Sequence, residues 1–175
     1  MKYCAFLRGV NVKGTNMKML DVCEIFKNAG MQKVTSVLAS GNILFESDKN
    51  VEKLKKILEQ KMSETFKYEA FLFILNENQI SEIFNNLPFE KEENFHNYVF
   101  ISLPETENIL MEEFKKSANP KFENGKIVNQ TFYWKTPKGN TLESQFGKIL
   151  GRKKMKDKFT SRNINTFEKI VSKLS

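Results

Sequence analysis

The sequence that decides the fold is KYCAFLRGVNVKGTN, residues 2–16, in which an apolar segment runs directly into a polar loop with two glycines. Both alternating sets of side chains after the first residue of this segment are apolar, so Lys2–Leu7 is predicted to be a strand covered on both faces. The apolar residues beyond the loop recur at helical spacing and predict a helix over Met17–Ala29. Asn16 suits its N-cap, and Gly30 suits the position just after its end.

The order of elements after this helix predicts an α+β unit. Val- and Thr-rich segments separated by the turn residues Ser40-Gly41 indicate two strands, and an amphipathic stretch and another apolar run follow. The β-α-β-β-α-β order that results is that of a ferredoxin-like unit with a mostly antiparallel sheet and packed helices. The expected elements are the strands Lys33–Ala39, Asn42–Glu46 and Glu69–Leu75 and the helix Lys49–Phe66, which Asp48 or Asn50 caps.

The same order then repeats along the chain. Asn76 and Gln79 form a capping-box pattern for a linking helix that ends at Pro88. We therefore predict two tandem ferredoxin-like halves, residues 1–75 and 98–175. A linking helix and loop over 76–97 joins them, and the two halves either stay separate or pack into one compact domain. The second half is expected to contain the strand Tyr98–Leu103, a helix that Thr106 caps and that runs to about Ser117, and strands near Phe122–Val128 and Thr131–Lys135 with an alternative turn at Asn124-Gly125. A helix opened by Asn140 and ended by Gly151, an extended piece near Phe159, and the helix Ile164–Leu174 are expected to follow.

Composition limits the class of protein. The chain has 175 residues, of which 40% are apolar and sixteen are phenylalanine, so it can bury a core and is not disordered. Its two cysteines, Cys4 and Cys23, lack metal-site spacing and are expected to be buried thiols. A signal peptide is not expected, because Arg8 interrupts the first apolar run, and no segment reaches the length of a membrane span. We therefore expect a cytoplasmic protein without a membrane partner.

Two polar segments far apart in the sequence are expected to meet. In a β-α-β-β-α-β unit the loop after the first strand and the turn between the second and third strands lie at the same end of the sheet. A guanidinium, an ammonium, amides, outward-facing N–H groups and a helix N-terminus suit an anion, so we expect a small phosphate- or carboxylate-bearing ligand there. The alternative is purely structural, with the glycines and asparagines shaping the loops. The expected ligand-binding residues are Arg8, Gly9, Asn11, Lys13, Gly14, Asn16, Ser40, Gly41 and Asn42.

Two residues near the C-terminus are added to the candidate ligand-binding set. Asn163 is a suitable N-cap for the last helix. Arg162 would lie just before the same helix N-terminus, where a cation is unfavourable. We therefore expect Arg162 to face a carboxylate or a ligand.

The motifs are similar to those of a known family. Arg8–Asn16, Met19 and Ser40–Asn42 with Phe45 resemble the opening of the bacterial family called domain of unknown function 1697 (DUF1697). Thr160–Thr166 resembles the closing T-x-R-N-x-x-T pattern of that family. The family is small and α+β and has no established activity. The resemblance therefore implies the fold and the choice of residues, but not a reaction.

A basic segment gives an alternative function. The net charge of the chain is +7, its pI is about 9.3, and Lys148–Arg162 holds seven basic residues and one acidic residue, Asp157. Such a run suits phosphates of nucleic acid, although it also suits a solvated loop after a helix. A protein-interaction module is the third possibility. The residues of the nucleic-acid alternative are Lys148, Arg152, Lys153, Lys154, Lys156 and Lys158.

The sequence assigns no reaction. His96 is the only histidine and lies in a polar stretch that is expected at the surface. Without it no Ser-His-Asp or Cys-His set can be assembled, and neither a metal cluster nor a P-loop pattern is present in the sequence. Whether the protein is an enzyme, and its oligomeric state, stay open. No cofactor and no metal are predicted. Trp134, in Phe132–Trp134, is expected in the core rather than on a base-stacking surface.

Overall fold

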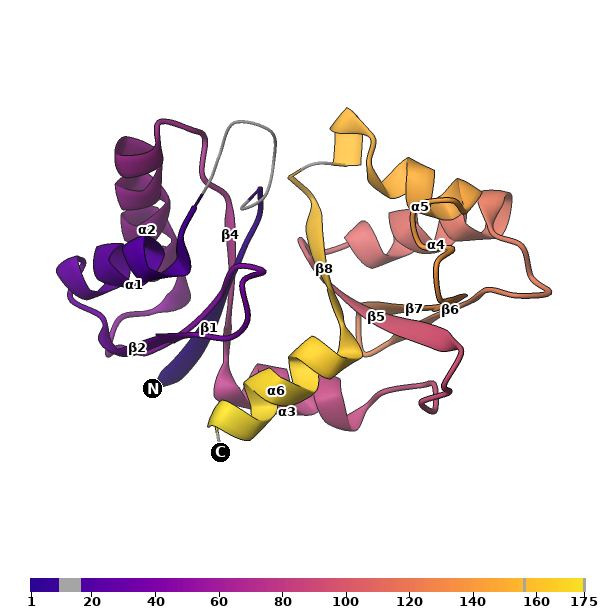
Figure 1. Cartoon of the computed structure of the whole chain (residues 1–175), viewed down its shortest axis with the longest axis horizontal. Helices are drawn as coiled ribbons and strands as arrows, with labels where there is room; N and C mark the ends of the chain where they lie inside the picture. The colour runs from indigo at the N-terminus through magenta and orange to yellow at the C-terminus, as the bar shows by residue number, and fades with distance from the viewer. Residues whose placement is uncertain (10–16, 156, 175) are drawn as a thin grey trace. The chain divides into compact units, whose positions relative to one another are not determined.

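The computed structural model describes residues 1–9, 17–155 and 157–174 (Figure 1). These residues form two four-stranded antiparallel sheets and six α-helices, so the α+β class is confirmed. The chain divides into two compact units, one of Met1–Glu82 with Glu168–Ser175 and the other of Ile83–Phe167. Each unit is described by itself.

The limits of these units differ from the segments expected from the sequence. One boundary falls inside the helix α3 (Glu77–Asn85) and the other inside the helix α6 (Ile164–Leu174). The polar stretch Glu90–Asn97, which ends the expected linking segment 76–97, lies wholly within the second unit. The expected capping box at the start of α3 is confirmed, since the Gln79 N–H donates to Asn76 Oδ1 at 2.9 Å and the Asn76 N–H donates to Gln79 Oε1 at 3.0 Å.

In the first unit the two helices α1 and α2 lie on one side of a sheet with strand order β2-β3-β1-β4 (Figure 1). The central strand β1 pairs antiparallel with both β3 and β4, and both alternating sets of its side chains are buried, as predicted. The elements of this unit are β1 (Lys2–Leu7), α1 (Met19–Asn28), β2 (Gln32–Ser36), β3 (Asn42–Glu46), α2 (Val51–Phe66) and β4 (Leu72–Asn76).

The end of α1 confirms the role expected of Gly30. This glycine has φ +87°, and its N–H donates to the carbonyl oxygen of Lys27 at 2.9 Å. The N–H of Met31 donates to the carbonyl oxygen of Phe26 at 3.1 Å. The two bonds form a Schellman motif, which needs a left-handed residue after the helix. Asn50 likewise caps α2, since its Oδ1 accepts from the Lys53 N–H.

The outermost strand of this sheet, β2, is irregular. Its register with β3 shifts between Gln32 and Thr35, and Lys33 has φ +48°. The strand ends at Ser36, so the predicted extension to Ala39 is wrong.

The second unit has the same arrangement of strands, in the order β6-β7-β5-β8. The hairpin between β6 and β7 turns at Asn129-Gln130, where φ is +46° and +60°, which is the signature of a type I′ turn. The alternative turn at Asn124-Gly125 is therefore wrong. The elements are β5 (Phe95–Ser102), α4 (Thr106–Ser117), β6 (Asn124–Val128), β7 (Thr131–Pro137), α5 (Gln145–Leu150), the 3₁₀ turn η1 (Lys153–Met155) and β8 (Phe159–Asn163).

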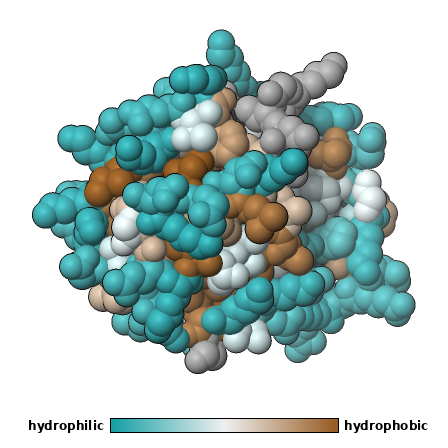
Figure 2. Space-filling model, turned by 60° about the vertical axis from the view of Figure 1, so that its left-hand side comes forward, coloured by the Kyte–Doolittle hydropathy of each residue, from teal (hydrophilic) through white to brown (hydrophobic). Residues whose placement is uncertain are grey.

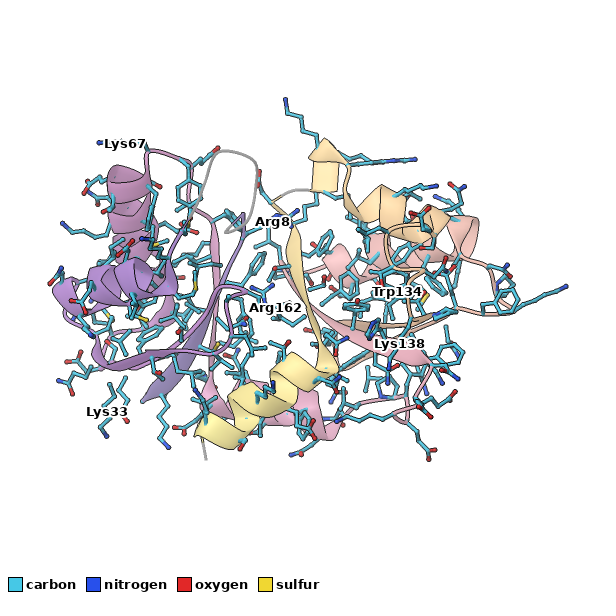
Figure 3. The ribbon with its side chains drawn as sticks, in the orientation of Figure 1. Arg8, Lys33, Lys67, Trp134, Lys138 and Arg162 are labelled. Carbon is cyan, nitrogen blue, oxygen red and sulfur yellow. The ribbon has the colours of Figure 1, made fainter. Side chains whose placement is uncertain are left out.

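Aromatic rings fill the core of the second unit. Trp134 is 1% exposed, lies 5.1 Å edge-to-face from Phe146 and stacks on Tyr98 at 5.5 Å between centroids (Figure 3). The indole Nε1–H donates to Glu123 Oε1 at 3.1 Å, which satisfies its one polar group. The prediction that Trp134 belongs to the core is confirmed, so its ring cannot stack on bases.

Three predicted helix starts are wrong. The first helix begins at Met19 rather than Met17, with Lys18 as N-cap, and Asn16 lies outside the described residues. The helix expected to be capped by Thr106 has Glu105 at its N-cap. The helix expected to open at Asn140 begins at Gln145, because Ser144 Oγ accepts from the Gly147 N–H and the residues before it form turns. A side chain suited to capping therefore marks a helix start only to within a few residues.

We expect Gly147→Ala to lower the free energy of unfolding by about 1–3 kcal/mol, because its methyl group would overlap the carbonyl oxygen of Thr141. Gly151→Ala is the matched control at the end of the same helix, since its Cβ would lie 3.6 Å from the nearest heavy atom, the carbonyl oxygen of Lys148, and its φ is −77°. Urea denaturation of both variants checks this, and equal stability of the two would contradict the packing argument.

Candidate functional site

The end of β1 lies against the loop between β2 and β3. The Leu7 N–H donates to the carbonyl oxygen of Gly41 at 2.7 Å, and the Arg8 N–H makes a longer bond of 3.4 Å to the carbonyl oxygen of Phe71. Gly9 and Gly41 have φ values of +78° and +76°, which glycine adopts without strain. The end of β1, directly before the first polar segment, is therefore a neighbour of the loop between β2 and β3, as the expected meeting of the two segments requires.

The described members of the candidate site differ in how exposed they are. Arg8 and Gly9 are half-buried, Ser40 is exposed, and Gly41 is buried. Solvent therefore reaches Arg8, Gly9 and Ser40 among them, whereas Gly41 is enclosed. The other expected contacts from the first loop lie outside the described residues: Asn11, Lys13, Gly14 and Asn16.

Asn42 holds the loop together. Its side chain is fully buried, and Nδ2 donates to the carbonyl oxygen of Val37 and to Ser40 Oγ, both at 3.0 Å. The Val37 N–H returns a bond to the carbonyl oxygen of Asn42 at 2.8 Å, which closes a loop longer than the tight Ser40-Gly41 turn that the sequence predicted. Because both amide hydrogens serve the loop, Asn42 is a structural residue of the corner rather than a ligand contact.

Arg162 and Asn163 belong to the second unit. Arg162 lies in β8 opposite Val99, and its Nη1 donates to Thr160 Oγ1 at 2.7 Å and to the carbonyl oxygen of Ser161 at 2.9 Å. It is thus a strand residue, 9% exposed, with acceptors on its own strand. Arg162 also lies just before α6, as expected from the sequence, because β8 ends at Asn163 and α6 begins at Ile164.

Asn163 caps the last helix, as expected from the sequence. Its Oδ1 accepts from the Asn165 N–H at 2.9 Å, and its Nδ2 lies 3.0 Å from His96 Nδ1. Because Nδ2 is a donor, this contact assigns the imidazole proton to Nε2. His96 is half-buried and packs edge-on against Tyr98 at 5.9 Å, so it lies at the surface with only part of its ring exposed.

The basic segment presents its cations outward. Met155 and Phe159 are 2% and 4% exposed and anchor the segment in the aromatic core. Lys158 is half-buried, and Lys156 lies outside the described residues. Among the residues that the structure describes, the segment's lysines and Arg152 form no ion pair. The exposed cations are Lys148, Arg152, Lys153 and Lys154.

Metal-binding and nucleophilic groups are sparse. No group of three or more His, Cys, Asp or Glu side chains suited to a metal ion occurs in the described part of the chain. Cys4 and Cys23 are free and buried, as predicted, and burial raises the pKa of the Cys23 thiol, which disfavours the reactive thiolate. None of the described helices combines the length and the apolar character that a membrane crossing requires.

Large exposed apolar side chains come from several separate elements. Hydrophilic atoms cover most of the face in Figure 2, and hydrophobic atoms lie in smaller areas between them. An extended exposed apolar face would support a protein-interaction module, and this scattered distribution supports one less. The most exposed such side chains are Met1, Leu20, Phe122 and Leu142.

We expect Asn42→Ala to destabilise the protein by about 1–3 kcal/mol, because it removes two buried hydrogen bonds of the loop. Asn78→Ala, at an exposed position of α3, is the control and should stay within about 0.5 kcal/mol of the wild type. Chemical denaturation measures both. A loss at Asn42 no larger than that at Asn78 would show that the amide does not hold the loop.

The comparisons place the chain in a family without an assigned activity. A conserved bacterial protein of Streptococcus pneumoniae, SP0830, matches 99% of this chain and 98% of its own with a TM-score of 0.80 and 22% identity, which shows a common fold alone. A search of curated proteins finds no match. The family model described as "Protein of unknown function (DUF1697)" matches residues 1–133, which include both loops of the corner but not Thr160–Thr166. With about three quarters of its length matched, this chain belongs to the DUF1697 family.

Proposed function

We propose that this protein binds a small phosphate- or carboxylate-bearing ligand at the corner where the loop after β1 meets the loop between β2 and β3. The observation that carries the proposal is the 2.7 Å bond between the Leu7 N–H and the Gly41 carbonyl oxygen, which joins the end of β1, directly before the first loop, to the loop between β2 and β3. The proposed contacts are Arg8, Gly9, Asn11, Lys13, Gly14, Asn16, Ser40 and Gly41, with Asn42 as the residue that supports them.

The chemistry of the corner favours an anion. The Arg8 guanidinium offers donors in a planar fork that matches phosphate and carboxylate oxygens. Ser40 is exposed, and its hydroxyl rotates freely enough to donate to a ligand while its oxygen accepts from Asn42. Left-handed φ at Gly9 and Gly41 gives these loops a backbone geometry that larger residues disfavour. These features support binding, and we assign no reaction to the site.

A separate proposal concerns the origin of the fold. We infer that residues 1–75 and 98–175 are two ferredoxin-like halves that arose by duplication and that 76–97 join them. The support is that both sheets follow the order of elements β-α-β-β-α-β with corresponding strands in corresponding positions. We further propose a cytoplasmic location, which fits the two free, buried thiols.

The ligand proposal predicts a loss of anion binding in Arg8→Gln. We expect the affinity for at least one of inorganic phosphate, sulfate, citrate and adenosine monophosphate to fall about tenfold or more, because a hydrogen bond to a charged group is lost. Calorimetry measures the affinity, and Lys13→Gln is a second variant that tests the same site. Arg152→Gln, an exposed arginine of the second unit, is the control and should bind like the wild type. The proposal fails if no probe binds the wild type, or if Arg8→Gln and Lys13→Gln both retain full affinity.

A second candidate function is nucleic-acid binding through the basic segment. The specific observation is that Arg152, Lys153 and Lys154 are exposed on a turn anchored by the buried Met155, and that Lys148 is exposed in the helix before it. Exposed cations of this kind suit phosphate contacts, and Lys156 and Lys158 extend the same run.

This candidate predicts salt-dependent affinity for mixed-sequence duplex DNA. In Lys153→Gln/Lys154→Gln the slope of log affinity against log salt should fall by about one to two, because two phosphate contacts are lost. The matched control is Lys115→Gln/Lys116→Gln, a neighbouring exposed pair at the end of α4. Fluorescence anisotropy between low and physiological salt measures the slope. No binding at low salt, or the same slope change in the control, would exclude this function.

A further inference from the structure

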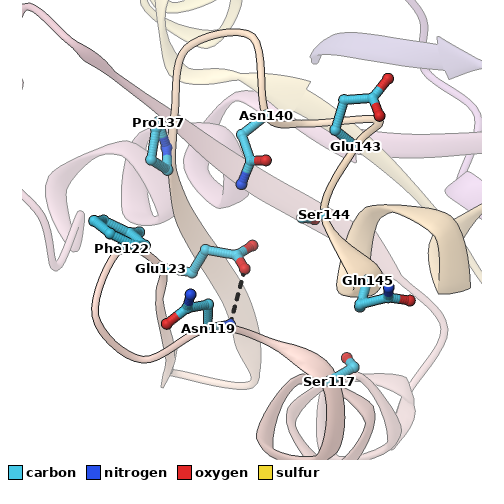
Figure 4. Close-up of a pocket in the computed structure, with 9 residues that line it drawn as sticks. All are labelled: Ser117, Asn119, Phe122, Glu123, Pro137, Asn140, Glu143, Ser144 and Gln145. Carbon is cyan, nitrogen blue, oxygen red and sulfur yellow. Dashed lines mark hydrogen bonds between the residues drawn. The ribbon is translucent and has the colours of Figure 1, made fainter.

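A polar cavity of about 460 Å³ lies in the second unit and shares no lining residue with either site described above (Figure 4). One wall comes from the loop between α4 and β6, and the other comes from the segment between β7 and α5. Its lining includes two carboxylates, three side-chain amides, two hydroxyls and one phenyl ring. No lysine or arginine lines it, although the chain carries a net charge of +7.

Both walls are held by hydrogen bonds of the main chain. The N–H groups of Phe122 and Glu123 donate to the carbonyl oxygen of Asn119 at 3.0 and 2.8 Å. In the opposite wall, the N–H groups of Glu143 and Ser144 donate to the carbonyl oxygen of Asn140 at 3.1 and 2.8 Å. The cavity is therefore largely formed before a ligand arrives, which lowers the entropy cost of binding.

A buried carboxylate forms the inner surface of the cavity. Glu123 is 6% exposed, and its Oε1 accepts from the Trp134 indole at 3.1 Å, while Oε2 accepts from the Asn119 N–H at 3.0 Å (Figure 4). An ionised carboxylate has about four acceptor positions, so two donors leave part of its capacity unused. The close-up shows this carboxylate between the two walls, directed into the space that they enclose (Figure 4).

The rim supplies a second negative charge and an aromatic face. Glu143 is exposed and forms no ion pair among the described residues. Phe122 is 57% exposed, whereas five other phenylalanines of this unit fill its core: Phe100, Phe114, Phe132, Phe146 and Phe159. A carboxylate on one wall and an aromatic face on the other are the two kinds of group that attract an ammonium or a guanidinium.

We propose that this cavity binds a small organic cation, an ammonium or guanidinium compound. Its charged end would lie between the carboxylates of Glu123 and Glu143, and its stem would pack against the ring of Phe122. Asn140 and Gln145 offer amide groups for the remaining hydrogen bonds. The inference is independent of the anion site, which lies in the other unit.

Agmatine, which carries a guanidinium and an ammonium, is the probe that tests this site. Calorimetry at low salt should detect agmatine binding and no binding of glucose, a neutral polyol of similar size. Glu143→Gln and Phe122→Leu should each weaken agmatine binding about two- to fivefold, and Phe122→Tyr should retain it, because tyrosine keeps the aromatic face. Both positions are exposed, so the fold does not depend on them.

Two controls separate this site from general charge effects and from the anion site. Glu112→Gln, an exposed acid on α4, should bind agmatine like the wild type, and so should Arg8→Gln. Absence of agmatine binding by the wild type overturns the proposal. So does equal binding of glucose, full affinity in Glu143→Gln and Phe122→Leu together, or an equal loss in Glu112→Gln.

Discussion

Burial of β1 on both faces is the constraint on which the first unit depends. Cys4, Ala5 and Phe6 are all fully buried, and the strand is flanked by β3 and β4. Where one face of a strand is polar, a slip of one residue exposes apolar groups and is therefore resisted. A strand that is apolar on both faces lacks this protection, so its register needs another source. The bond from Leu7 to Gly41 and the buried amide of Asn42, whose residue is paired with Phe6, supply it. The corner proposed to bind an anion is thus also the point that fixes the sheet.

The sequence predicted those parts of the fold that local chemistry decides. Gly30 ends α1 because glycine adopts the left-handed φ of this position without strain. The reciprocal bonds of Asn76 and Gln79 start α3, as the capping pattern indicated. Burial of Trp134 followed from its apolar neighbours. The order of strands followed from the rules that connect consecutive elements, which depend little on individual side chains.

The parts that the sequence did not predict depend on contacts between distant residues. Whether an asparagine faces a ligand or its own loop is decided by the space around it, and Asn42 is fully enclosed. Arg162 lies just before α6, as the sequence indicated, but its place in β8 opposite Val99 depends on pairing with a distant strand. The cavity beside Glu123 had no signal in the sequence, because its carboxylates and amides come from two loops that are unremarkable by themselves. Of the candidate anion site, the meeting of the two loops was predictable, whereas the inward turn of Asn42 was not.

The irregular outer strand of the first sheet has a consequence for how the molecule behaves at high concentration. An outermost strand offers unpaired N–H and carbonyl groups to any other chain, and a long regular one is a template for aggregation. In β2 the register shift between Gln32 and Thr35 and the left-handed backbone of Lys33 interrupt that row of groups, and the lysine adds a charge at the same point. A second molecule approaching this edge finds no continuous ladder to extend, so the defect protects the protein against intermolecular sheet growth.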